Sequence, residues 1–149
     1  TRWDLTMTDT RRLLCRSAIA GGMGGWYGFF SNSPHPYPNP EWLRCHYAFW
    51  HGHDRYLRDF VRANALTNGH CLMDSSGSNY VAYKERTSSI DLDLSGATGP
   101  LPAVAVDCSA SYSEIDLGPL PPSRQTVGLP HSSDWALAVG RFGASPRGD

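Results

Sequence analysis

Apolar residues recur at helical spacing in the first part of the chain and at alternate positions in the second part. The first helical pattern predicts a helix over residues 10–20, with Asp9 as its N-cap. We expect this helix to end at Gly21-Gly22, because glycine readily adopts the conformation that terminates helices. The apolar positions that carry the pattern are Leu13, Leu14, Ala18 and Ile19.

A second helical pattern begins at Asn39-Pro40, where a capping residue precedes a proline at the first helical position. The sequence His51-Gly52-His53 interrupts this pattern, which then resumes, so we expect either one kinked helix or two consecutive helices. Aromatic residues at this spacing are typical of a packed core. The apolar face comprises Trp42, Leu43, His46, Tyr47, Phe49, Trp50, Tyr56, Leu57, Phe60 and Val61.

The segment between the two helical patterns combines glycines, aromatic residues and prolines. Residues 21–25 are rich in glycine, which indicates a tight turn or a close backbone approach. The aromatic residues that follow, within residues 25–30, predict a strand. Prolines alternate with other residues from Pro34 to Pro40. Because proline restricts φ, residues 31–40 should form a stiff, extended loop that presents His35 and Tyr37.

From Gly69 onward the period is two, which predicts short strands with one buried face and one solvated face. The expected strands cover residues 70–74, 79–83, 88–94, 103–108, 112–117 and 135–139. Several strands without helices between them indicate an antiparallel β-sandwich. The fold class is therefore α+β, divided into a helical segment at 1–66, a sandwich at 67–142 and a flexible tail at 143–149.

Composition excludes several classes of function. The 149 residues carry a formal net charge of −1, and no basic tract suggests a nucleic-acid partner. No apolar run is long enough for a membrane helix, so we expect no membrane partner either. Residues 1–10 lack the order of a signal peptide, and the absence of an initiator methionine predicts that the chain begins inside a longer product.

The cysteines allow three pairings. Position on predicted helices favours Cys15 with Cys45, and position on predicted strands favours Cys71 with Cys108. Two disulfides would suit a secreted protein, whereas the alternative is four buried free thiols. No Cys-x-x-Cys pair is present, which argues against zinc and thioredoxin-like chemistry.

Several short motifs carry a resemblance to one family. The second half contains Cys71-Leu72, Tyr80-Val81-Ala82-Tyr83, Ile90-Asp91-Leu92-Asp93-Leu94-Ser95-Gly96, the run from Leu101 to Asp107, and Asp134-Trp135-Ala136-Leu137-Ala138-Val139. These resemble the small β-sandwich, labelled collagen-binding, that follows the catalytic barrel of apiosidase-like glycoside hydrolases. The first half, with Asp9-x-Arg11-Arg12 to Gly22 and then Gly25-Trp26-Tyr27-Gly28, resembles the penultimate helix and last strand of that barrel.

The resemblance implies a helical and last-strand remnant of a (β/α)₈ barrel followed by the sandwich. A complete barrel takes 200 residues or more, with about 250 typical. Glycoside hydrolysis needs two opposed carboxylates, which the family pattern places upstream of Thr1. The resemblance therefore implies carbohydrate as the partner and assigns no catalytic residue, cofactor or metal to this chain.

The acidic residues of the helical half offer only one candidate for the substrate site. Asp9 is explained as a cap, Glu41 as a complement to the helix dipole, and Asp54 and Asp59 as solvated positions. Asp4, which lies beside Trp3, is retained as a substrate-binding candidate. The acids of the second half, Glu85, Asp91, Asp93, Glu114 and Asp116, alternate with apolar residues and indicate the wet face of the sheet.

Metal and nucleophile motifs are weak. His51-x-His53 with His46 one turn earlier could ligate a metal, but histidines around a glycine at a helix break more often form a cap, and zinc requires three or four ligands. A Ser-His-Asp triad could be composed, yet no Gly-x-Ser-x-Gly elbow is present. We therefore expect no metal site and no cofactor.

Aromatic residues near the glycine-rich turn form the predicted sugar site. Sugar rings stack their C–H faces on aromatic rings, and their hydroxyls bind polar side chains at the rim. Trp26 and Tyr27 at the strand end, with His35 and Tyr37 on the proline-rich loop, offer this combination. The alternative is plain core packing of the same rings.

Two functions follow from these patterns. The first is the C-terminal portion of a secreted, carbohydrate-active protein, closing a barrel whose other part carries the acids. The second is a non-enzymatic extracellular module that binds carbohydrate or assembles with copies of itself.

Overall fold

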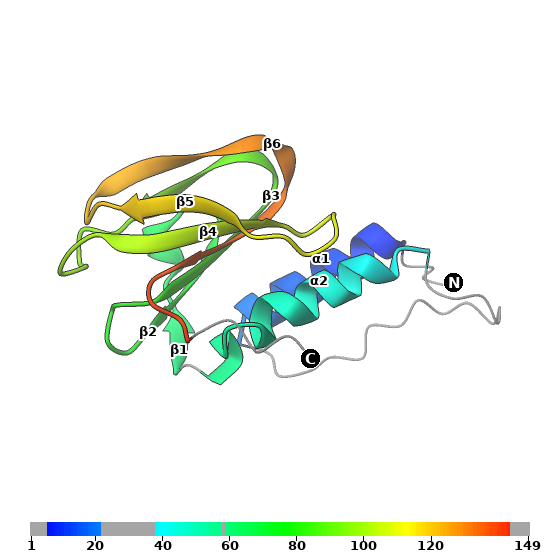
Figure 1. Cartoon of the computed structure of the whole chain (residues 1–149), viewed down its shortest axis with the longest axis horizontal. Coiled ribbons are helices and arrows are strands. Elements are labelled where there is room, and N and C mark those ends of the chain that lie inside the picture. The colour runs from blue at the N-terminus through cyan, green and yellow to red at the C-terminus, as the bar shows by residue number, and fades with distance from the viewer. Residues whose placement is uncertain (1–5, 22–37, 58, 144–149) are drawn as a thin grey trace.

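In the computed structural model, which describes residues 6–21, 38–57 and 59–143, two helices lie side by side against one face of an antiparallel sheet (Figure 1). The predicted strand at 25–30 and the proline-rich loop up to Tyr37 lie outside the described residues. The helices precede the strands in the chain, as the α+β prediction requires.

Helix α1 spans Met7–Ile19 and begins earlier than the sequence suggested. Its N-cap is Thr6, whose hydroxyl accepts a hydrogen bond from the Asp9 amide at 3.1 Å. In return, the Asp9 carboxylate accepts a hydrogen bond from the Thr6 amide at 3.1 Å. The prediction of Asp9 as N-cap was wrong, because this reciprocal capping box satisfies the first turn three residues upstream. The glycine stop is confirmed at Gly21, which has a φ of 83° just after the C-cap.

Helix α2 spans Pro40–His51, and its predicted start at Asn39-Pro40 is confirmed. The helix ends at His51, with Gly52 as its C-cap, and no α-helix follows in the described residues. Asp54 has a φ of 52°, which turns the chain into a short 3₁₀ helix, η1 at Arg55–Leu57, and then strand β1 at Phe60–Arg62. The prediction of a kinked or second helix was therefore wrong beyond His51, because the left-handed residue breaks the helical path.

Six strands form one sheet in the order β1-β2-β3-β6-β4-β5, with every neighbouring pair antiparallel. The strand predicted at residues 70–74 is confirmed as β2, whereas the two expected at 79–83 and 88–94 form one continuous strand, β3. The bounds are β2 His70–Asp74, β3 Tyr80–Asp93, β4 Leu101–Asp107, β5 Ile115–Leu120 and β6 Arg124–Val139, with a 3₁₀ turn η2 at Asn64–Leu66.

The two longest strands bend together, which replaces the expected two-sheet sandwich by one curled sheet (Figure 1). The register between β3 and β6 shifts between Lys84 and Thr87 and again between Thr87 and Ser89. Arg86 within this stretch has a φ of 51°. Because bulges bend strands without ending them, β3 and β6 run through both halves and keep the sheet continuous. The sandwich prediction is corrected accordingly for the described residues.

The sheet buries a different core on each face, as side-chain alternation along strands requires. One face folds upon itself around Trp135, Ile90 and Leu137, all fully buried. The other face packs against helix residues, among them Ile19 and Phe49. The division of the chain at residue 66 stays a prediction, and the hydrogen-bonded sheet itself begins at β1.

Candidate functional site

The predicted sugar-binding residues all lie outside the described part of the chain. They are Trp3, Asp4, Trp26, Tyr27, His35 and Tyr37. Their grouping into one site stays a prediction. The described residues form five other clusters of polar or reactive side chains: a buried ion-pair cluster, a thiol cavity, an arginine-centred cluster, a polar groove and a set of serines and a histidine around Asp107.

A buried ion-pair cluster joins helix α1 to strand β6. The Asp134 side chain is 2% exposed and accepts hydrogen bonds from Arg11, whose side chain is 5% exposed, and from Arg12 at 2.7 Å. It also accepts the Arg86 amide at 2.9 Å, at the bend of β3. The Arg11 guanidinium lies 4.5 Å from the centre of the Trp42 ring on α2. One carboxylate therefore holds both helices and the bend of the sheet in place.

The cluster determines the charge state of Asp134. Burial by itself would raise the pKa of this carboxyl, but the hydrogen bonds from Arg12, the Arg86 amide and Arg11 hold the pKa below its ordinary value. Arg16, one turn along α1, forms a more exposed pair with Glu85 at 2.6 Å. The sequence contains both the Arg11-Arg12 and the Asp134-Trp135 motif, but it does not predict that they meet, because no local pattern links residues so far apart in the chain.

The four cysteines are free thiols rather than two disulfides. The predicted pairing of Cys71 with Cys108 is wrong, because the two side chains belong to cores on opposite faces of the sheet. Cys45 does not bond to Cys15 either, and its sulfur instead lies 3.6 Å from the Asp107 carbonyl oxygen. The alternative of four buried free thiols is the one the structure supports.

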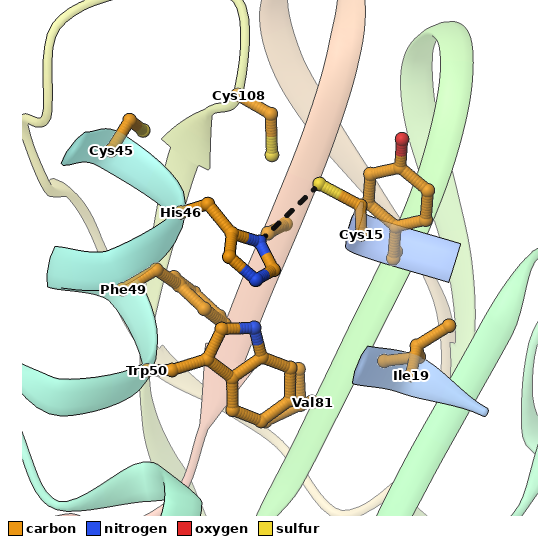
Figure 2. Close-up of a pocket in the computed structure, with 10 residues that line it drawn as sticks. Cys15, Ile19, Cys45, His46, Phe49, Trp50, Val81 and Cys108 are labelled. Carbon is orange, nitrogen blue, oxygen red and sulfur yellow. Dashed lines mark hydrogen bonds between the residues drawn. The ribbon is translucent and has the colours of Figure 1, made fainter. Parts of the chain in front are cut away.

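Three of these thiols, Cys15, Cys45 and Cys108, meet His46 around a small cavity between the helices and the sheet (Figure 2). The Cys15 sulfur lies 3.8 Å from Nδ1 of His46. A hydrogen bond with Cys108 and the nearby imidazole lower the pKa of Cys15, while the same hydrogen bond and burial raise the pKa of Cys108. Burial raises the pKa of Cys45 and of Cys71 to about 12. The sequence predicted Cys15 next to Cys45, but it placed Cys108 with Cys71 and His46 with His51 and His53, so it did not predict that these four residues meet.

A third cluster centres on Arg55, which is 2% exposed. Its guanidinium donates to the Phe49 carbonyl at 2.7 Å and to the Glu114 carboxylate at 2.8 Å. His53 lies 3.1 Å from the same carboxylate. Burial would raise the pKa of Glu114, but hydrogen bonds from Tyr112 and Arg55 hold the pKa below its ordinary value. Glu114 was expected on a wet face, and the structure places it as the counter-ion of a buried arginine.

A polar groove of about 480 Å³ lies where η2 faces the far ends of β3 and β6. Asp91 accepts hydrogen bonds from Asn68 at 2.8 Å and from Thr126 at 2.7 Å. Asp93 pairs with Arg124 at 2.6 Å, and a hydrogen bond from Ser95 is the main reason that its pKa falls to about 2. Both acids lie on the solvated face of β3 that the alternation predicted.

No catalytic triad is assembled by the serines and histidine around Asp107. Ser109 and Ser133 each donate to one carboxylate oxygen at 2.6 Å, and His131 lies 2.8 Å from the other oxygen. A triad requires the serine hydroxyl to bond the imidazole, so this arrangement only stabilises the Asp107 carboxylate by hydrogen bonds. Within residues 6–21, 38–57 and 59–143, no set of three or more potential ligands is placed to hold a metal ion.

Comparison with known proteins identifies relatives of the fold. No family model and no curated protein matches the chain. A glycoside hydrolase family 5 structure from Bacteroides vulgatus ATCC 8482 superposes with a TM-score of 0.66 at 15% identity, over 94% of this chain and 37% of that one. A second structure, described as a glycoside hydrolase, superposes with a TM-score of 0.60 at 13% identity, over 97% of this chain and 38% of its own.

The fold is thus glycoside-hydrolase-like, and the chain spans somewhat over a third of each of these two structures. At this identity the likeness establishes the fold alone. Helices long and apolar enough to cross a bilayer are not found in the described ranges.

Proposed function

We propose that this chain is the C-terminal portion of a secreted, carbohydrate-active protein of the glycoside hydrolase type. The observation that carries the proposal is the superposition of 94% of the chain on a glycoside hydrolase of which it covers 37%. A chain that matches just over a third of a hydrolase has the size of a closing segment plus an accessory domain. The apiosidase-like motifs around Arg11-Arg12 and Asp134-Trp135 support the same assignment.

In this proposal the two helices contribute the last part of a (β/α)₈ barrel, and the curled sheet is the accessory domain. The catalytic acid and nucleophile belong to the upstream part of the protein. The described acids support this division, because Asp134 and Glu114 are committed to buried arginines and Asp107 to serines and a histidine. A general acid or nucleophile must instead face the scissile bond.

The substrate site of the proposal is the aromatic set Trp26 and Tyr27, with His35 and Tyr37 at its rim and with Trp3 and Asp4 beside it. Aromatic rings would stack on the sugar, and the polar side chains would bind its hydroxyls. A sugar that stacks on one indole ring should lose about tenfold in affinity when the ring is removed, the equivalent of about 1.4 kcal/mol.

Titration of the intact chain with a panel of soluble polysaccharides, followed by isothermal calorimetry, tests this site. Trp26→Ala should weaken binding about tenfold and leave the circular dichroism spectrum unchanged. Tyr47→Ala is the matched control, because Tyr47 is an aromatic residue 63% exposed on α2, outside the proposed site. Equal affinity of the wild type and Trp26→Ala would reject the stacking role.

The hydrolase assignment has its own test, which is the size of the native product. Immunoprecipitation from the natural source under native conditions should recover a barrel segment of about 250 residues. That segment should be either joined to this chain or bound to it. Recovery of a single polypeptide of 149 residues would reject the assignment.

A second function, a non-enzymatic carbohydrate-binding or self-assembling module, is favoured by one observation. The buried cluster of Arg11, Arg12 and Asp134 anchors the helices on the sheet, so the described helices share a core with one face of the sheet. This function would be supported by polysaccharide binding, or by concentration-dependent oligomers in sedimentation, in a product that contains no barrel segment.

A further inference from the structure

The cavity between α1, α2 and the sheet is small, apolar and lined by sulfur. Its volume is about 20 Å³, and Cys15, Cys45, His46 and Cys108 form one side of it (Figure 2). A cavity of this volume admits about one water-sized molecule. The remaining lining, which includes Phe49, Trp50 and Val81, excludes larger polar reagents.

The three thiols of the cavity are not equivalent. In Figure 2 the Cys15 sulfur points toward His46, and the Cys108 side chain points into the same space. Cys45 instead contacts the Asp107 carbonyl with its sulfur at 3.6 Å, which turns it away from the pair. Cys15 and Cys108 are each only 7% exposed, and both line the cavity.

Four titratable groups face Cys15 within this packing: His46 on α2, Cys108 after β4, Tyr83 on β3 and the more distant Cys45. The hydrogen bond with Cys108, together with the imidazole of His46, lowers the pKa of Cys15. The pKa of Cys108 is raised by the same hydrogen bond and by burial. Cys15 has an imidazole next to its sulfur and shares the cavity with Cys108, which is the combination of a reactive thiol and a nearby second thiol that a two-cysteine redox site requires.

We infer that Cys15 and Cys108 form a peroxide-reactive pair, in which Cys15 is oxidised first and Cys108 then closes a disulfide between α1 and the end of β4. The oxidant is hydrogen peroxide, because its two oxygen atoms are far closer to the size of this cavity than a glutathione disulfide is. This inference does not depend on the carbohydrate role proposed above.

The chemistry balances in two steps. The Cys15 thiolate attacks one peroxide oxygen, the S–O bond forms and the O–O bond breaks, and the departing hydroxide takes up the proton that the Cys15 thiol gave up on ionising. Cys108 then attacks the sulfenic sulfur of Cys15, the S–S bond forms and the S–O bond breaks, and the second hydroxide leaves with the proton of Cys108. Two thiols and one peroxide thus become one disulfide and two waters.

The experiment treats the reduced chain with hydrogen peroxide, alkylates the remaining thiols after denaturation and maps the peptides by mass spectrometry. We expect the loss of two of the four thiols and a linked peptide that joins Cys15 to Cys108, with a mass lower by two hydrogen atoms. Oxidised glutathione at the same concentration should react at least about tenfold more slowly. A linked peptide that contains Cys45 or Cys71, or four free thiols after treatment, would overturn the inference.

Variants separate the two roles. In Cys108→Ser, peroxide should leave Cys15 as a sulfenic acid that dimedone captures, whereas in Cys15→Ser the three remaining thiols should all stay reduced. Cys71→Ser is the matched control, because Cys71 is buried in the other core, and it should form the same disulfide as the wild type. The mapping of the wild-type chain needs no variant, so it decides the matter even if a substitution prevents folding.

Discussion

Substitution of Asp134 by asparagine tests whether the buried ion-pair cluster holds the helices on the sheet. Asparagine has nearly the same shape as aspartate, so the change removes a charge and leaves the packing in place. Arg11 then remains 4% exposed without an anionic partner, and Arg12 loses the carboxylate that accepts from it at 2.7 Å and 3.1 Å. The perturbation therefore acts on the electrostatics of the helix–sheet contact.

The expected loss is large because the partners are enclosed. Breaking a buried ion pair by removing one partner costs about 3–5 kcal/mol, since the other charge is left desolvated and uncompensated. A domain of ordinary stability has about 5–15 kcal/mol in total, so the variant should retain a weakened native state or lose it at moderate temperature.

The matched control is Glu85→Gln, another carboxylate-to-amide change that contacts the same helix. Glu85 pairs with Arg16, whose side chain is 52% exposed, and lies 3.6 Å from Arg12, which keeps its closer partner Asp134, so the control should cost less than about 1 kcal/mol. Urea denaturation at neutral pH measures both variants, and the midpoint of Asp134→Asn should fall by at least about 1 M. Near-ultraviolet circular dichroism gives a local check, because Trp42 stacks on Arg11.

The pH dependence has a definite sign. The folded-state pKa of Asp134 is lowered, so the stability that it contributes is present above its unfolded value, about pH 3.9, and is lost as the pH falls through the lower folded value. The difference between wild type and Asp134→Asn should therefore stay constant from neutral pH down to about pH 4 and narrow below it. Two variants with equal urea midpoints, or a difference that widens in acid, would refute the reasoning.

Three other substitutions probe separate features, each measured by urea or thermal unfolding. Gly140→Ala should lower the free energy of unfolding by about 2–4 kcal/mol, because φ is 128° and a Cβ would lie 2.5 Å from two neighbouring oxygens. The control Gly77→Ala, which has a positive φ but open space around it, should lower it by only about 1–2 kcal/mol. Equal losses in the two variants would contradict this prediction. Thr6→Ala should lower the free energy of unfolding by about 1 kcal/mol because the helix loses its N-cap, whereas Thr6→Ser should keep most of that stability. An alanine variant as stable as the wild type would count against the capping box. Glu114→Gln should lower the free energy of unfolding by about 1.5–3 kcal/mol, because Arg55 loses a charged partner. Since the pKa of Glu114 is lowered in the folded state, this difference from the wild type should disappear in acid. A difference in stability that does not change with pH would contradict the prediction.

Local patterns in the sequence determined the element types of this protein wherever the interactions that shape them are themselves local. The start of α2 at Asn39-Pro40, the glycine stop at Gly21 and the strand at 70–74 depend on backbone preferences and on side-chain alternation within a few residues. The same kind of information also misled: apolar residues after His51 continue a helical spacing, but the left-handed Asp54 diverts the chain into a 3₁₀ turn and a strand.

Tertiary structure alone decided which residues meet. Cys71 and Cys108 are both on or next to strands, yet the pleat sends them to opposite faces of the sheet, so no spacing rule could have shown that they cannot pair. The partners of Asp134 likewise come from the other end of the chain, and they are brought together only because the bend at Arg86 lets one sheet curl and receive α1. Contacts between segments so distant are selected by the packing of the whole core, which no short window of sequence contains.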